Sequence, residues 1–194
     1  MRKVGAGILT VVAVLVSAAA ALAQETAQEK LIVVYGLSIP DRVGSLVYAR
    51  TIDFESKSPG LGYALRFGGQ PAWMVDVYLY DLGLKTIPSD AESDVIKNQL
   101  TQARGDIFEL GKRGTYGNVT DKGDFKVPES GKPRFICSSF GYLRGERVDI
   151  DVESYLCLSS WKDKFVKIRM TAPKGTLTKS DATSFVQAWI ELLR

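Results

Sequence analysis

The 194-residue chain contains no histidine and only two cysteines. Without histidine it lacks the side chain that most often acts as a general base near neutral pH and as a metal ligand. Sites of the Ser-His-Asp and Cys-His kinds are therefore excluded within this chain. Zinc sites that need histidine are excluded too, and two cysteines cannot form a four-cysteine site. We therefore expect no resident metal, no cofactor and no enzymatic activity. A histidine-free hydrolase with a Ser-Lys pair is the alternative, but no spacing in the chain favours it.

The N-terminus has the pattern of an export signal. A short basic start, Met1–Lys3, precedes an almost wholly apolar run over Val4–Ala20, and Ala21–Ala23 then matches the A-x-A pattern of a cleavage site. The pattern predicts a signal peptide over residues 1–23 and one mature domain over 24–194. Its alanine-rich style favours a bacterium, so the protein is expected to be periplasmic or secreted. An uncleaved membrane anchor is the alternative, because the apolar run is nearly long enough to span a bilayer.

The charge balance of the chain is close to neutral. Its 25 basic residues exceed the 22 acidic ones by three, and two of the basic residues, Arg2 and Lys3, lie in the leader. A mature chain of mixed charge gives no electrostatic reason to expect nucleic acid or an anionic membrane as a partner. No second apolar stretch is long enough to span a membrane, so we expect no membrane span after signal cleavage.

Short β-rich runs and two amphipathic segments predict an α+β fold. The early strands are expected over 31–35, 46–54, 63–67 and 73–82, with a turn at Ile39–Arg42 after the first, and a weaker strand over 115–127. Apolar stripes predict helices over 89–110 and 178–194, with the Ser89 and Thr178 side chains at their starts. We expect an antiparallel sheet of about six to eight strands flanked by these helices, with docking of the first helix on a partner as the alternative.

The stretch Pro133–Ala172 contains three β-rich runs and both cysteines, Cys137 and Cys157. The cysteines lie in successive strands, almost symmetrically about the expected turn, so they can face each other in an antiparallel pair. In an oxidising compartment this arrangement predicts a disulfide. Two buried thiols are the alternative, because a shift of one residue in register would place them on opposite faces. A redox-active pair lacks the C-x-x-C spacing.

Two sets of polar residues are candidate binding sites. The first is a carboxylate row, Asp149, Asp151 and Glu153, which alternates with apolar residues on one strand. It suggests a cation site or a surface for a basic partner, and the plainer interpretation is a solvated face with counter-charges at Arg144, Arg147 and Lys167. The second set combines aromatic residues with an arginine and could line a ligand groove, although such residues more often belong to the core. Its members are Tyr63, Arg66, Trp73, Tyr78 and Tyr80.

The order of these elements resembles the PsbP-like fold group. A capped helix over 89–110 follows an early β section, a glycine-rich strand over 115–127 leads into a meander, and the last strand, 165–170, comes just after Trp161. The terminal helix carries Ser184-Phe185-Val186. The group includes the photosystem II extrinsic P subunit, a nuclear-import factor that binds the GTPase Ran, and DcrB-type periplasmic proteins. The block from Asp76 to Leu84, with Ile87-Pro88, looks like the signature of a narrower, uncharacterised bacterial secreted family.

The resemblance implies a non-enzymatic role by analogy of fold. We expect a binding or assembly-accessory protein of the cell envelope that has a protein partner there. The alternative is a carrier of a small apolar or lipid-like ligand that uses the aromatic early β section. This alternative requires a pocket beside Trp73 and Tyr78.

Overall fold

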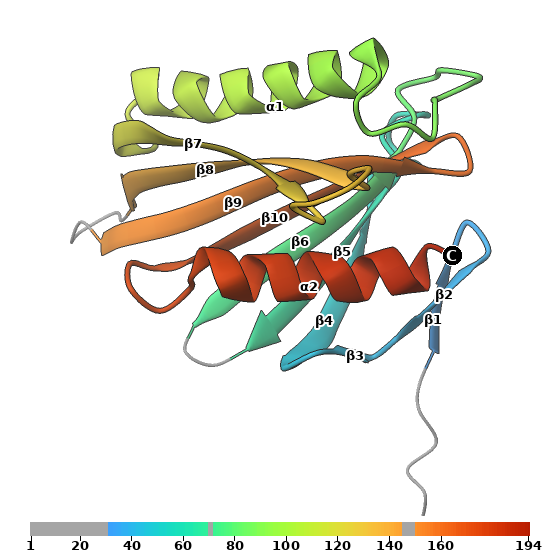
Figure 1. The fold of residues 1–194 in the computed structure, drawn as a ribbon, viewed down its shortest axis with the longest axis horizontal. Helices are drawn as coiled ribbons and strands as arrows, with labels where there is room; N and C mark the ends of the chain where they lie inside the picture. Colours follow the sequence, from blue (N-terminus) through green and yellow to red (C-terminus); the bar gives the residue numbers. More distant parts are fainter. Residues whose placement is uncertain (1–30, 70–71, 145–149) are drawn as a thin grey trace, which may run out of the picture.

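The computed structural model describes residues 31–69, 72–144 and 150–194, so the predicted leader lies outside the described part. The elements are arranged as two sheets and two helices (Figure 1). The strands are β1 (Leu31–Val34), β2 (Leu37–Pro40), β3 (Arg42–Val43), β4 (Leu46–Asp53), β5 (Tyr63–Gly69), β6 (Trp73–Tyr80), β7 (Gly117–Val127), β8 (Phe135–Arg144), β9 (Ile150–Trp161) and β10 (Lys164–Pro173). The helices are α1 (Asp94–Lys112) and α2 (Lys179–Leu192). No helix in these ranges is long and apolar enough to cross a membrane.

The main sheet has eight strands in the order β3-β4-β5-β6-β10-β9-β8-β7, and every neighbouring pair is antiparallel. This confirms the predicted α+β class, the strand number and the meander β8-β9-β10. Residues Val75, Val77 and Leu79 of β6 are buried on one face of the sheet, and Asp76 and Tyr78 lie on the other. The alternation follows from the two-residue period of a strand.

The predicted disulfide is present. Cys137 and Cys157 are paired directly across β8 and β9, with their Cα atoms 4.0 Å apart and both side chains fully buried. Both sulfurs belong to the core on the α2 side of the sheet. The register that the sequence left open is thus the one that places both cysteines on the same face.

The expected turn at Ile39–Arg42 is wrong, because this segment contributes to β2 and β3. The chain turns earlier, at Tyr35 and Gly36, whose φ angles are 52° and 79°. Two consecutive positive φ angles are typical of the tight hairpin turn that joins β1 to β2. Pro40 is tolerated because it is the last residue of β2, a strand that pairs only with β1. The N–H group that proline lacks would point away from β1, so no hydrogen bond between the two strands is lost.

Helix α1 begins four to five residues later than the sequence predicts. Its N-cap is Ser93, whose Oγ accepts a hydrogen bond from the Ile96 N–H at 3.4 Å, and Ser89 has no such role. The preceding segment is held in place by tertiary contacts, because the Pro88 carbonyl accepts a hydrogen bond from Ser160 Oγ. Asp90 forms a local turn by accepting the Glu92 N–H. These contacts keep residues 88–92 out of the helical conformation.

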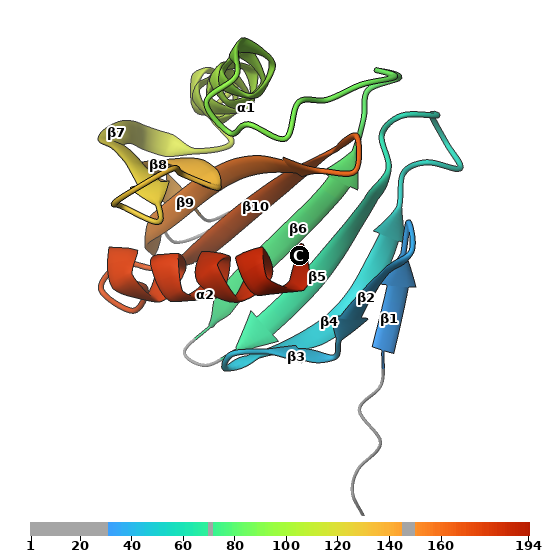
Figure 2. The same ribbon diagram turned by 45° about the vertical axis from the view of Figure 1, so that its right-hand side comes forward.

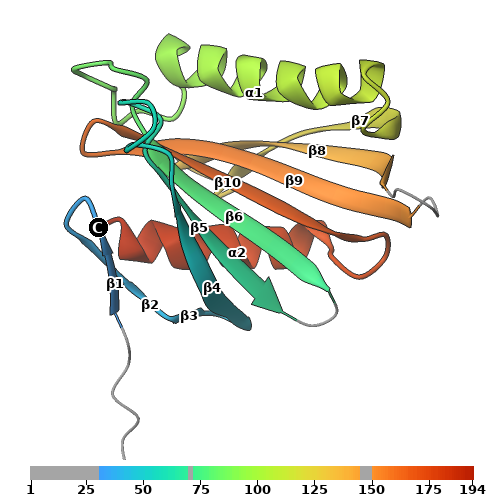
Figure 3. The same ribbon diagram turned by 180° about the vertical axis from the view of Figure 1, so that it is seen from behind.

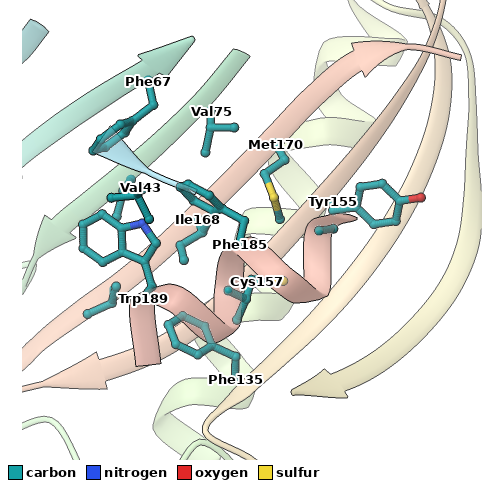
Figure 4. Packing of buried hydrophobic residues seen from close by; sticks show 14 of the residues in the cluster. Val43, Phe67, Val75, Phe135, Tyr155, Cys157, Ile168, Met170, Phe185 and Trp189 are labelled. Carbon is teal, nitrogen blue, oxygen red and sulfur yellow. The ribbon is translucent and has the colours of Figure 1, made fainter. Parts of the chain in front are cut away.

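Helix α2 starts as predicted, with a capping box between Thr178 and Asp181. Its wide apolar face packs into the curved sheet, as Figure 2 shows. Trp189 is completely buried there and makes edge-on contact with Phe67, next to Phe185 (Figure 4). Aromatic packing of this kind contributes about 0.5–1.5 kcal/mol per pair beyond the burial of area.

The two helices lie on opposite faces of the sheet, and α1 covers only part of its face. Helix α1 packs on β7, β8 and β9, and Ile96, Leu100 and Ile107 are buried against them. We call this side of the sheet the α1 face. Figure 3 shows that the ribbon of α1 runs along the β7–β9 half and does not extend over β4, β5 and β6. The α1 face of β5, β6 and part of β10 is therefore not covered by α1.

Candidate functional site

The predicted aromatic set is divided between the two faces of the sheet. Tyr63 and Trp73 lie on the α2 side, where they pack against the main core. The Trp73 indole N–H donates to the Thr176 carbonyl at 2.8 Å, which fixes it as a structural side chain. Tyr78 and Tyr80 lie on the α1 face and pack against the other core cluster. A single groove that contains both Trp73 and Tyr78, as the carrier hypothesis requires, is therefore not formed.

Two members of the carboxylate row are engaged in ion pairs. Asp151 lies 3.4 Å from Lys174 Nζ, and Glu153 lies 2.9 Å from Lys122 Nζ. Lys122 reaches Glu153 across Gly141, where a Cβ atom would lie 2.8 Å from the lysine chain. Asp149 lies outside the described residues. The described residues contain no cluster of three or more histidine, cysteine or acidic side chains that could hold a metal ion.

The counter-charges of this row are thus Lys122 and Lys174. The expectation that Arg144 and Lys167 would neutralise the row is wrong, because both lie on the α1 face and Asp151 and Glu153 lie on the α2 side. Arg147, the third expected counter-charge, lies outside the described residues. The plainer interpretation of Asp151 and Glu153, a solvated and charge-balanced face, fits these contacts.

The exposed part of the α1 face holds two adjoining hollows that share Tyr78, and we call them together the trough. The cationic hollow, of about 180 Å³, contains Arg66, Asp76, Tyr116, Arg144 and Arg169. The apolar hollow, of about 230 Å³, is lined by Phe54, Leu61, Leu82 and Tyr80, with Lys167 on its floor and Gln99, Gln102 and Asp106 from α1 on one side. The trough contains four cations and two carboxylates, so its net charge is positive.

Arg66 and Asp76 form the anchored pair of the trough. They face each other across β5 and β6, and the guanidinium binds both carboxylate oxygens at 2.7 and 2.8 Å. This bidentate geometry is the strong form of an arginine–carboxylate pair, and the hydrogen bond to Asp76 raises the pKa of Arg66. With both of its oxygens bound to Arg66, Asp76 has little capacity left to neutralise a second cation.

Arg169 lies next to Asp76 in the register of β6 and β10. It is half-buried, and it donates to the Tyr142 hydroxyl at 3.1 Å and to Ser154 Oγ at 3.4 Å. Its guanidinium lies 5.7 Å from the ring centre of Tyr116, which stacks on Tyr142 at 4.2 Å. Burial is the largest single influence on Tyr142 and disfavours its phenolate, but the positive charge of Arg169 and the hydrogen bonds to Thr171, Ser154 and Arg169 together outweigh it, so the pKa of Tyr142 falls. The arginine is thus oriented by hydroxyls and rings.

Lys167 lies two residues before Arg169 on the same face of β10 and is also half-buried. Its Nζ is 4.4 Å from the ring centre of Tyr78 and 5.3 Å from that of Tyr80. Burial lowers the pKa of Lys167, and repulsion from Arg169 adds to this, while Asp106 opposes both. Within the described ranges, neither Lys167 nor Arg169 forms an ion pair with a carboxylate.

The apolar wall of the trough is positioned by a loop between β4 and β5. The Glu55 carboxylate accepts hydrogen bonds from the Gly60 and Gly62 N–H groups at 3.0 and 2.8 Å. Gly62 has a φ of 65°, and a Cβ atom there would lie 1.8 Å from the Leu79 carbonyl oxygen. This close approach brings Leu61 beside the trough, where it remains 44% exposed; Leu82 on the neighbouring turn is 43% exposed. Two large apolar side chains are thus held at the surface by a rigid loop.

A larger hollow, of about 360 Å³, lies between α1 and β7, but its cations are either ion-paired or exposed. Arg104 binds Asp121 and Asp124, and Lys126 binds Glu92 at 2.6 Å, while Lys97 is exposed to water. The trough is the stronger candidate because its two central cations are half-buried and form no ion pair among the described residues.

The sequence pattern indicates Arg66, Tyr78 and Tyr80 but not the centre of the trough. It suggests Lys167 only as a counter-charge and gives no role to Arg169, Tyr116 or Tyr142. A signal for two of them was present, since Lys167 and Arg169 occupy alternate positions between the apolar residues of Phe165–Met170. Alternation of cations in a central strand indicates a face that is not closed by the core.

No protein-family model and no curated protein matches this chain. The assignment of a function therefore depends on the geometry and charge of the trough.

Proposed function

We propose that the protein is a non-enzymatic binding protein of the bacterial cell envelope, with a layout of the PsbP-like kind, and that the trough is its binding site. The observation that carries the proposal is the pair Lys167 and Arg169, two half-buried cations without a carboxylate partner among the described residues. The leader-like N-terminus and the buried disulfide support a place outside the cytoplasm.

The physical argument concerns the cost of burying charge. A cation that is removed from water loses hydration, and proteins normally compensate by pairing it with a carboxylate. At Lys167 and Arg169 the compensation comes from aromatic rings and hydroxyl groups, which are weaker partners for a full charge. A bound anionic group would supply the missing charge. Perturbed ionisable groups of this kind are more frequent at functional sites than elsewhere.

A carrier that uses the apolar hollow, and not the groove beside Trp73 and Tyr78 that the sequence suggested, is the second candidate, and the apolar wall beside Lys167 favours it. A side chain or chain segment of low polarity can pack against Leu61 and Leu82 while an anionic group lies near the cation. However, the apolar wall is open to solvent, with Leu61 and Leu82 44% and 43% exposed, whereas small-molecule pockets usually bury most of the ligand surface. The exposed wall therefore favours a segment of a partner over an enclosed small molecule.

Site-specific photo-crosslinking in the living cell tests this proposal. A photo-reactive amino acid at Gln102, which is exposed beside the trough, should yield a discrete adduct with an envelope protein. The same residue at Gln187, exposed on α2 across the sheet, is the matched control and should not yield that adduct. The adduct should disappear when Arg169→Met is combined with the probe at Gln102. Identical adducts from both positions, or none from Gln102, would contradict the proposal.

Export is tested separately by fractionation. The protein should be released with the periplasmic contents, and N-terminal sequencing of the released chain should begin at Gln24. A chain that stays in the cytoplasm with Met1 intact would refute the predicted leader.

A further inference from the structure

We propose that the trough recognises an extended acidic peptide with the pattern apolar-x-acidic-x-acidic. This inference rests on the proposed function, because it specifies the ligand of the same site. It commits to a protein segment as the occupant, and the argument comes from charge complementarity and from the spacing of the cations on β10.

The two cations set the spacing of the acidic positions. Lys167 and Arg169 are separated by one residue on a regular strand, so their Cα atoms lie about 7 Å apart on the same face. Side chains at alternate positions of an extended peptide have the same separation. A peptide that runs along β10 can therefore present one carboxylate to each cation. Adjacent acidic residues would point to opposite sides of the peptide and could not do so.

For a peptide that runs parallel to β10, the apolar position precedes the acidic ones. Phe165, two residues before Lys167, pairs with Tyr80 at the end of β6, and the apolar hollow adjoins this end. A bulky side chain two positions from the first carboxylate would therefore contact Leu61 and Leu82. Burial of such a side chain contributes about 25 cal/mol per Å² of apolar area removed from water.

The remaining groups of the trough favour a peptide over a lipid or a free anion. Gln99 and Gln102 on α1 present amide groups, which can donate to and accept from a peptide backbone. The apolar wall is short and exposed, so an acyl chain could not be enclosed by it. Asp106 beside Lys167 can accept a hydrogen bond from a peptide N–H, a donor that an acyl chain and a free anion both lack.

The test measures binding of three synthetic peptides to the purified protein by fluorescence anisotropy, with a neutral dye at the N-terminus of each. The first contains Leu-Ser-Glu-Ser-Glu, the second Leu-Ser-Gln-Ser-Gln, and the third Leu-Ser-Ser-Glu-Glu. We expect the first peptide to bind at least about tenfold more tightly than the second, because hydrogen bonds between charged groups are lost in the second. It should also bind more tightly than the third, which has the same composition.

Variants locate the binding in the trough. Lys167→Met and Arg169→Met keep the aliphatic length but remove the charge, and each should weaken binding of the first peptide about tenfold or more. Lys179→Met removes an equal charge from the opposite side of the sheet and should leave binding unchanged. Equal binding of the three peptides, or equal effects of all three variants, would overturn the inference.

Phosphatidylglycerol vesicles provide the alternative occupant. In this case the protein should sediment with the vesicles, and Arg169→Met should abolish its sedimentation. If this is observed and the peptides do not bind, the peptide assignment is wrong. Failure of the peptide assignment can be distinguished from failure of the proposed function. If the crosslink in cells depends on the trough but the purified protein does not bind the peptides, only the peptide pattern is overturned. Absence of both the crosslink and the peptide binding overturns both proposals.

Discussion

Breaking the disulfide between Cys137 and Cys157 should lower the free energy of unfolding by about 3 kcal/mol. The two cysteines are separated by 20 residues, and the loss of denatured-state entropy on closing a loop of that size is about 11 cal/mol/K, which gives about 3 kcal/mol at 25 °C. For a protein of this size the midpoint of thermal unfolding should fall by about 6–12 °C. The urea dependence should also steepen, because an uncrosslinked denatured chain exposes more surface.

A double-mutant cycle separates the bond from the packing of the two buried side chains. Cys137→Ala and Cys157→Ala each remove the whole bond and one side chain, whereas the double variant removes the bond only once. The sum of the losses in the free energy of unfolding of the two single variants should therefore exceed the loss of the double variant by about 3 kcal/mol. The assay is urea unfolding followed by tryptophan fluorescence. Additive costs would refute the reasoning, and the coupling should vanish when the unfolding is repeated with reductant.

Three further substitutions and one control test the energetics of the trough and its supporting loop. Lys167→Met should raise the free energy of unfolding by about 1 kcal/mol, since it replaces a half-buried, unpaired cation by an apolar chain of similar shape; a loss of stability in urea unfolding would mean that Lys167 is compensated. Gly62→Ala should lower the free energy of unfolding in urea by about 3 kcal/mol or more, because the new Cβ atom would collide with the Leu79 carbonyl oxygen. Gly44→Ala is the control: Gly44 has a φ of 60° but free space around it, so the loss should be only about 1 kcal/mol. Burial raises the pKa of Tyr80, so above about pH 10 this tyrosine ionises first in the unfolded chain, and the free energy of unfolding falls as the pH rises. Tyr80→Phe should flatten this alkaline decline in urea midpoints measured from about pH 8 to 11. An unchanged slope would contradict the assignment.

The helix starts illustrate what local sequence could and could not determine. Thr178 and Asp181 form the predicted capping box because nothing outside the segment competes for them. Ser89 and Ser93 are both acceptable caps by residue type. The choice of Ser93 depended on the hydrogen bond from Ser160 to the Pro88 carbonyl, a contact between residues 72 positions apart. A local pattern carries no information about that contact.

The sequence by itself determined the class of fold, the strands of the meander and the apolar face of α2. These features follow from periodicity and capping, which are local properties of the chain. The pairing of the two cysteines was only predicted by their spacing, and the register of β8 and β9 decided it. The tertiary structure alone decided which side chains form the trough. Lys167 comes from β10, Arg66 from β5 and Leu61 from a loop, and they meet because α1 covers only the β7–β9 half of its face. The position of α1 on the sheet is set by packing between distant segments, so no local pattern could show which polar residues would remain uncovered.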